Sequence, residues 1–185
     1  MSALTIYPAK QPQHGTTYRD FDTIASQLGG IGVQFERWEP GSEFISEVEV
    51  LTVMDAYQRH IDRLKQQFGF QSVDVVSLKP DHPEKLAMRR KFLSEHTHDD
   101  FEVRFFVEGR GLFYLHVDDK VYAILCEQGD LISVPAHTKH WFDMGETPDF
   151  KCIRLFTTED GWIASFTGDP IADSFPTFEQ YLASL

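Results

Sequence analysis

The sequence predicts a mainly β fold with flanking α-helices, in which antiparallel strands form a sandwich or a barrel. From residue 96 onward, short apolar segments recur every eight to twelve residues or so and alternate with turn residues. Helical periodicity is confined to segments before residue 95. The chain shows no repeat, linker or low-complexity segment, and its 16 Phe are ample for a core. We therefore expect residues 1–185 to form a single domain.

Residues 1–95 are expected to be a mixed helical and strand part that packs on the barrel. Residues 33–36 alternate in polarity as a strand does. Ser46 and Glu49 have the spacing of a capping box, which opens a helix. Apolar residues then recur at steps of three and four until Gly69 closes the helix, and these are Leu51, Met54, Tyr57, Ile61, Leu64 and Phe68.

Two shorter elements complete this part of the chain. Residues 73–76 contain three valines and predict a strand. Pro83 suits a first helical turn and leads into a second helix, expected from Glu84 to Leu93. Both helices are expected to cover the outside or one end of the barrel.

Residues 96–160 are expected to supply the barrel strands, and residues 161–185 an aromatic tail that packs on them. Turns are predicted at residues 109–111, 118–120 and 128–130, where Gly and Asp residues gather. The expected strands are residues 101–108, 112–117, 121–127, 131–135, 141–142 and 151–157.

A group of metal-binding residue types lies at the start of this strand region. Residues at even separation share one face of a strand, so His96, His98, Glu102 and Arg104 are expected to point the same way. His140 follows about forty residues later in an equally apolar context. A carboxylate buried among imidazoles needs a cation. The set of His96, His98, Glu102 and His140 suits a borderline divalent metal such as Fe, Ni, Mn or Zn.

Composition and charge exclude several classes of partner. A net charge of −12 and a pI near 5.0 argue against nucleic acids and anionic membranes. No apolar run approaches the ~20 residues that span a bilayer. The N-terminus has no basic or apolar signal region, and Cys126 and Cys152 fit reduced core thiols. We expect a soluble cytoplasmic protein that acts on a small molecule, most simply as a monomer, although the sequence leaves the oligomeric state open.

The metal motifs resemble those of the cupin superfamily. His96-x-His98-x3-Glu102-x6-Gly109 is similar to the first cupin motif, and Gly129-x5-Pro135-x4-His140 to the second. The chain departs from the pattern at Arg90, His137 and Met144, which puts the local loop shape in doubt more than the ligands. The resemblance implies a cupin-type antiparallel β-barrel, or jelly roll, with one metal held inside. Its spacing selects His140 over His137 as the fourth ligand.

Longer segments resemble acireductone dioxygenase, over essentially the whole chain. They are residues 35–38, 95–98, 102–109, 131–138, 140–145 and 161–164. The resemblance implies a methionine-salvage enzyme that oxidises 1,2-dihydroxy-3-keto-5-(methylthio)pentene with O2. With Fe(II) the family makes formate and 2-keto-4-methylthiobutyrate. With Ni(II) it makes formate, carbon monoxide and methylthiopropionate.

Substrate residues are less well defined than the metal ligands. Arg104 is expected to bind the substrate anion, or else to pair with Glu102. Arg154 either lines the same cavity or forms a salt bridge at a sheet edge. An apolar slot for the methylthio chain is expected from Phe92, Phe105, Phe142 and Trp162. Any general base is left open, because Phe101 follows Asp99 and Asp100 directly before the metal Glu.

Two other functions are compatible with the motifs. One is a different cupin dioxygenase or isomerase, which would keep the four ligands but not the residues around Arg104 and Trp141. The other is a cupin that binds a small molecule without catalysis. An intact set of four ligands argues against this second alternative, since binding alone rarely needs a metal with open positions.

Overall fold

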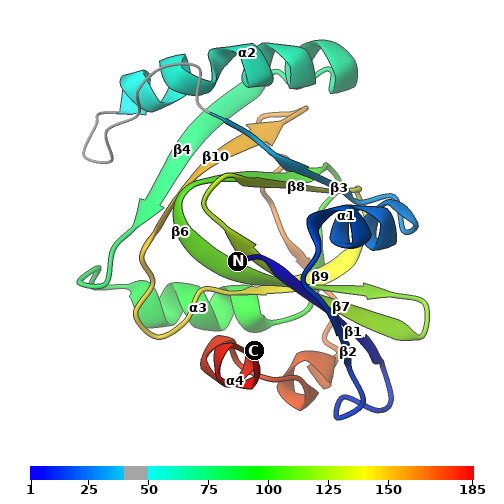
Figure 1. The fold of residues 1–185 in the computed structure, drawn as a ribbon. Coiled ribbons are helices and arrows are strands. Elements are labelled where there is room, and N and C mark those ends of the chain that lie inside the picture. The colour runs from blue at the N-terminus through cyan, green and yellow to red at the C-terminus, as the bar shows by residue number, and fades with distance from the viewer. Residues whose placement is uncertain (40–49) are drawn as a thin grey trace.

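The computed structural model describes residues 1–39 and 50–185. Most of its elements are antiparallel strands, with helices placed around them (Figure 1). In chain order they are β1 (Ala3–Pro8), β2 (Thr16–Tyr18), α1 (Phe21–Gly29), β3 (Gln34–Arg37), α2 (Val50–Phe68), β4 (Ser72–Leu78), α3 (Lys85–Leu93), β5 (His96–Thr97), β6 (Glu102–Val117), β7 (Lys120–Glu127), β8 (Asp130–Val134), β9 (Lys139–Asp143), β10 (Phe150–Phe156), β11 (Ser165–Phe166), the 3₁₀ helix η1 (Pro170–Ser174) and α4 (Phe178–Ser184). The predicted mainly β, antiparallel fold is confirmed.

The long strand β6 belongs to two layers of sheet and joins them. Its first half pairs with β8 and β10, which in turn pair with β3 and β4. Its second half pairs with β7 and β9, in a layer that continues to β1 and β2 on one side and to β5 and β11 on the other. All of these pairings are antiparallel, and Figure 1 shows β6 curving around the middle of the molecule. The interior between the two layers is where the site lies.

The predicted turn at residues 109–111 is wrong, because these residues continue β6 through a bulge. Gly109 has φ +71°, and β10 shifts its register against β6 between Lys151 and Cys152. A Cβ on Gly109 would lie 1.9 Å from the carbonyl oxygen of Asp149, so only glycine fits. A bulge adds one residue and therefore changes which alternate side chains face inward. Even-numbered Phe106 faces the interior before the bulge, and odd-numbered Phe113 faces it afterwards.

Three apolar clusters pack on the strands. The interior cluster contains Phe106, Phe113 and Phe142 between the two layers. A second cluster lies where α2 covers the outside of β6 and β10, with Tyr57 and Ile61 among its residues. The third is formed by the C-terminal segment against β7 and β9; its members include Trp141, Phe175 and Tyr181. The C-terminal segment therefore packs on the barrel.

The two predicted helices and most of the predicted strands are present. The capping box at Ser46 and Glu49 lies outside the described residues, whereas Gly69 ends α2 with φ +75° as expected. Elements β1, β2 and α1 were not predicted. Cys126 and Cys152 are free and buried, as expected, and burial raises the pKa of the Cys152 thiol to about 12. None of the helices in the described ranges has the length and apolar character needed to cross a membrane.

Candidate metal centre

Three histidines predicted as ligands come together inside the barrel. His96 on β5 lies directly opposite His140 on β9, and His98 follows β5 in the connection to β6. One ring nitrogen from each of the three lies within 4.8 Å of the others, and all three side chains are buried. The four residues expected to share one face do not lie on one strand, because β5 ends at Thr97 and β6 begins at Glu102. The turn after β5 still directs His98 to the same point.

The hydrogen bonds of the three rings fix which nitrogen faces the centre. Each Nδ1 lies against a backbone carbonyl oxygen: His96 on Ser94 at 2.7 Å, His98 on Ile163 at 2.8 Å and His140 on Thr138 at 2.8 Å. A carbonyl oxygen only accepts, so each Nδ1 carries the proton and each neutral Nε2 keeps its lone pair. Metal-bound histidines are oriented in the same way in known sites. The donor set therefore fits a divalent metal.

Burial keeps these imidazoles neutral. It lowers the pKa of His96, and lowers that of His140 to about 4 with the neighbouring His96 adding to the effect. A neutral imidazole is the form that binds metal, so protons compete weakly at neutral pH.

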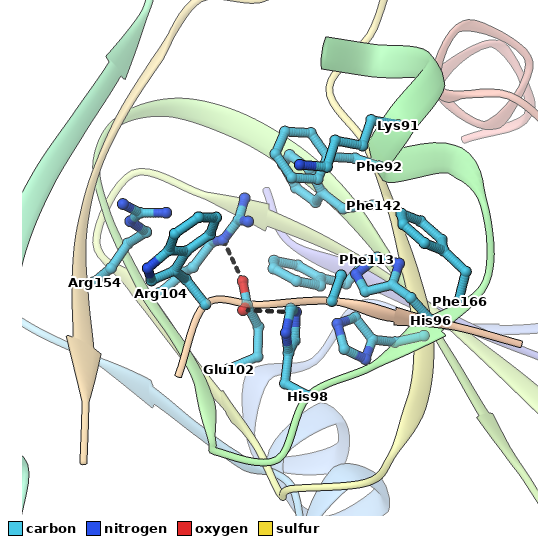
Figure 2. A pocket seen from close by; sticks show the side chains of 13 residues that line it. Lys91, Phe92, His96, His98, Glu102, Arg104, Phe113, Phe142, Arg154 and Phe166 are labelled. Atoms are coloured by element: carbon cyan, nitrogen blue, oxygen red, sulfur yellow. Dashed lines mark hydrogen bonds and ion pairs between the residues drawn. The ribbon is translucent and has the colours of Figure 1, made fainter. Parts of the chain in front are cut away.

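Glu102 begins β6 beside the histidines. Its Oε2 lies 3.5 Å from Nε2 of His98, and its Oε1 accepts a hydrogen bond of 2.6 Å from Nε of Arg104 (Figure 2). Burial alone would raise the pKa of Glu102, but the charge of Arg104 and the nearby histidines lower it to about 2. The group is therefore a carboxylate, with one oxygen beside Nε2 of His98.

The guanidinium of Arg104 is enclosed by aromatic rings. Its Cζ lies 4.6 Å from the centroid of Phe142, 5.4 Å from Phe113 and 5.7 Å from Phe92. Its Nε bonds to Glu102, and no hydrogen bond from its two terminal nitrogens is found among the described residues. In the described part of the chain, every fully buried side-chain nitrogen has a hydrogen-bond partner. The terminal nitrogens of Arg104 have none in that part, so they are not fully buried and are open to the cavity.

A cavity of about 160 Å³ joins the histidines to Arg104. Phe92, Phe142 and Trp162 line it, in the places predicted for an apolar slot. Arg154 also lines the cavity, and its guanidinium donates hydrogen bonds of 2.9 and 2.6 Å to Asp74. The two alternatives expected for Arg154, a place in the cavity wall and a salt bridge, are therefore both present.

The placement of Phe105 in this slot is wrong. Phe105 lies outside the cavity, stacked at 4.7 Å on Trp38 and packed on Tyr57 under α2. Side chains alternate along a strand, so a residue next to the inward-facing Arg104 points outward.

Sequence reasoning missed four residues of the cavity: Lys91, Phe113, Ala164 and Phe166. Phe113 pairs directly with Phe142 across β6 and β9, so strand pairing could have indicated it once the bulge was recognised. Phe166 pairs with His96 through the two-residue strand β11, which has no sequence pattern. Figure 2 shows Lys91 and Phe92 on α3 at the same side of the cavity.

The other candidate polar residues lie apart from the centre. His137 has φ +64°, a side chain 73% exposed, and Asp99 as its neighbour at 3.5 Å. His116 lies 2.6 Å from buried Glu95, outside the histidine cluster. Asp100 accepts hydrogen bonds from the backbone of Phe101 and from residues 157–158. These bonds occupy the Asp100 carboxylate in holding backbone, which disfavours it as a base.

Comparison with known proteins agrees with this geometry. A model of the ARD/ARD' family matches residues 8–164. The acireductone dioxygenase of Methylococcus capsulatus is 58% identical over 98% of each chain, and that of Aquifex aeolicus is 51% identical over 97% of this chain and 98% of its own. The chain belongs to the acireductone dioxygenase family. Its relatives identify it as an enzyme, a metal-dependent dioxygenase that acts on an acireductone.

A solved structure extends the comparison to the fold. Acireductone dioxygenase from Bacillus anthracis with a cadmium ion in its active centre matches with a TM-score of 0.79 and 26% identity, over 90% of this chain and 98% of that one. The expected cupin-type fold is confirmed by this likeness. Together with the three histidines, it supports a metal site in this member of the family.

Proposed function

We propose that the centre holds one Fe(II) or Ni(II) per chain through Nε2 of His96, His98 and His140 and a carboxylate oxygen of Glu102. The observation that carries this proposal is the arrangement of the three rings, whose Nδ1 atoms all bond to backbone carbonyls while their other nitrogens converge. The cadmium ion of the Bacillus anthracis enzyme supports a divalent metal here. Two histidines of the set face each other across paired strands, which favours a rigid site.

The proposed substrate is 1,2-dihydroxy-3-keto-5-(methylthio)pentene. The three histidines and Glu102 would hold the metal, which would act as a Lewis acid on the enediol oxygens and lower the pKa of those hydroxyls. Arg104 then directs its free terminal nitrogens to the negative charge of the bound enediolate. Charge-assisted hydrogen bonds in a partly dry cavity hold that charge more strongly than water does. Glu102 keeps the Arg104 guanidinium in place through Nε.

The apolar side of the cavity fits the methylthio chain. Phe92, Phe142 and Trp162 offer carbon surface close to Arg104. This arrangement orients the substrate with its polar oxygens toward the histidines and its thioether toward the rings. It also excludes water from the carbons that react with O2.

The metal is proposed to set the products. Fe(II) gives formate and 2-keto-4-methylthiobutyrate, which continues methionine salvage. Ni(II) gives formate, carbon monoxide and methylthiopropionate. We further infer that the chain acts in the cytoplasm as a monomer. Its partners would be the small-molecule substrate and O2 alone. The net charge of −12 supports the absence of nucleic acid and anionic membrane partners.

The test is O2 consumption with synthetic acireductone by metal-stripped, Fe(II)-loaded and Ni(II)-loaded protein. The proposal expects rapid uptake only with metal, and carbon monoxide only with Ni(II). Uptake no faster than the non-enzymatic reaction with both metals would contradict the proposed substrate.

Two neighbouring histidines give a matched pair for the metal ligands. His140→Ala removes one of the three convergent nitrogens, and is expected to lose metal and activity together. His137→Ala changes an exposed histidine three residues away and is expected to keep both. Full metal stoichiometry in the His140→Ala protein would contradict the ligand assignment.

A further inference from the structure

Residues 157–168 form an outer wall of the cavity, and we refer to them as the strap. Trp162, Ala164 and Phe166 of the strap line the cavity, although Trp162 is 53% exposed and Phe166 is 51% exposed. No strap residue belongs to the three apolar clusters of the described chain. The strap is therefore held by contacts other than burial in the core.

The start of the strap is bonded to Asp100. This buried carboxylate accepts hydrogen bonds from the backbone nitrogens of Thr157 at 2.7 Å and Thr158 at 3.1 Å, and from Oγ1 of Thr157 at 2.7 Å. Gly161 packs so closely that a Cβ there would lie 2.3 Å from Oδ2 of Asp100. Trp162 is the next residue, so its position follows from this contact.

The end of the strap is bonded to Glu95. Oε2 of Glu95 accepts a hydrogen bond of 2.7 Å from Oγ1 of Thr167, and its backbone oxygen accepts one of 3.0 Å from Thr167 N. His116 holds the other carboxylate oxygen at 2.6 Å, and the Glu95 side chain is fully buried. Between the two ends, Phe166 pairs with His96.

Both carboxylates flank the segment that carries two of the histidines. Asp100 and Glu95 are thus built into the same short stretch as His96 and His98. We propose that Asp100 and Glu95 are positioning residues that fix the two ends of the strap, and so place Trp162 and Phe166 as the wall against which the substrate chain packs. The claim about the substrate rests on the proposed function; the claim about the strap does not.

Tryptophan fluorescence reports on the strap directly. The chain has three tryptophans; Trp38 and Trp141 are 3% and 1% exposed, so a polar quencher such as acrylamide reaches Trp162 above all. Quenching is measured on protein with matched metal content and without substrate. Trp162→Phe provides the assignment, because it should remove most of the quenchable emission.

Asp100→Asn weakens the first anchor. Thr167→Val removes the hydroxyl that bonds Glu95 at the second anchor and accepts a hydrogen bond from Asp169 N. Each is expected to raise the quenching constant at least twofold and the KM for acireductone about tenfold, with kcat within about threefold, because a lost wall removes binding shared by ground and transition states. If Asp100→Asn fails to fold, Thr157→Val provides a milder change at the first anchor, because it deletes a single hydrogen bond to Asp100.

Asp20→Asn is the matched control. Asp20 accepts bonds from the nitrogen and Oγ1 of Thr23 at 2.9 and 2.8 Å, the same pattern as Asp100 with Thr157, but it caps α1. It should change neither quenching nor KM.

Unchanged quenching in both Thr167→Val and the Asp100 or Thr157 variant would overturn the anchoring. Raised quenching with unchanged KM would overturn the strap as a substrate wall. A wild-type protein without turnover would instead contradict the proposed function, and would leave the quenching result intact.

Discussion

Two buried arginines in this molecule pair with carboxylates, and they use their remaining donors differently. Arg89 on α3 bonds both oxygens of Asp143 at 2.8 and 3.0 Å, and its Nη2 also bonds Glu179 on α4 at 2.8 Å. Arg104 bonds Glu102 through Nε only and leaves its terminal nitrogens to the cavity. An arginine satisfied by the protein holds elements together, whereas one left partly unsatisfied beside a cavity is available to a ligand.

The surroundings of the two pairs follow the same division. Asp143 also accepts hydrogen bonds from the backbone of Gly145 and Phe178, so the Arg89 pair ties α3, β9 and α4 together. The Arg104 guanidinium is surrounded by aromatic faces instead, which contribute no competing acceptor. Buried ion pairs are weak evidence for stability by themselves, but the loss of one partner is costly. The comparison therefore predicts a stability effect at Arg89 and a catalytic effect at Arg104.

Substitution of Arg104 should have the largest effect on the reaction. Arg104→Ala is expected to lower kcat/KM by about 10²–10³-fold, comparable to the loss of one preorganised donor to a developing anion. Arg104→Lys should fall between this variant and the wild type, because it keeps a charge but loses the planar fork. Oxygen uptake and metal analysis on the same samples check both points. Retention of more than a tenth of the activity by metal-loaded Arg104→Ala would show that Arg104 does not stabilise the reacting anion.

Substitution of Arg89 should act on stability. Arg89→Ala leaves buried Asp143 without its cation and is expected to lower the free energy of unfolding by about 3 kcal/mol. For a chain of this size that corresponds to a fall in Tm of roughly 6–12 °C. Denaturant unfolding and calorimetry measure it, and kcat/KM of the folded variant should stay within about threefold.

Arg110 provides the control for this prediction. It lies 3.9 Å from Glu127 with a half-exposed side chain, so Arg110→Ala should change stability by less than about 1 kcal/mol. Equal losses of unfolding free energy in Arg89→Ala and Arg110→Ala would show that the buried pair with Asp143 stabilises the fold no more than an exposed pair does.

The bulge in β6 supports the aromatic enclosure that sets Arg104 apart from Arg89. Gly109→Ala would place a methyl group against the Asp149 carbonyl and force a positive φ on alanine. We expect a loss of about 2 kcal/mol in stability from the backbone conformation and crowding. Activity should fall as well, since Phe113 reaches the cavity only through the register that the bulge creates. Normal activity in a destabilised Gly109→Ala protein would contradict that role of the bulge.

The smallest expected effect is a pH dependence at the Arg89 network. Burial raises the pKa of Glu179, but the backbone of Glu146 and the Arg89 guanidinium bring it below the ordinary 4.5. A carboxyl with a lowered folded pKa stabilises the fold above its unfolded pKa, and that stability is lost as pH falls through the folded value. Glu179→Gln should therefore flatten stability below about pH 4.5, by well under 1 kcal/mol because the side chain is half exposed. Unfolding curves from pH 3 to 6 or so would show an unaltered acid limb if this is wrong.

The convergence of His96, His98 and His140 could be predicted from the sequence, for a physical reason. Imidazoles and a carboxylate within apolar strands have few alternatives to a metal, and their spacing depends on local strand geometry. Arg104 and Glu102 have the same strand parity, and both lie in the interior as this parity predicts. The same parity predicts that Phe105 lies outside the cavity, because a residue adjacent to Arg104 on a strand faces the other way.

The rest depended on contacts between distant segments. The carbonyl of Ile163 orients His98 from 65 residues away, and nothing in the sequence around Ile163 marks that role. Phe113 reaches the cavity because of the bulge in β6. In the sequence, the glycines around Gly109 are typical of a turn rather than of a bulge. Asp100 resembled a candidate base, but its partners at residues 157–158 lie on a segment without a regular pattern.

In the proposed centre, three Nε2 atoms and Glu102 hold the catalytic metal beside Arg104. Anomalous diffraction from crystals of the Ni(II)-loaded protein tests it most directly. We expect a single strong peak per chain about 2.1 Å from Nε2 of His96, His98 and His140, a typical imidazole–metal distance, with a Glu102 oxygen in the same shell. A peak bound by His137 or His116, or contact through any Nδ1 of the three histidines, would contradict it.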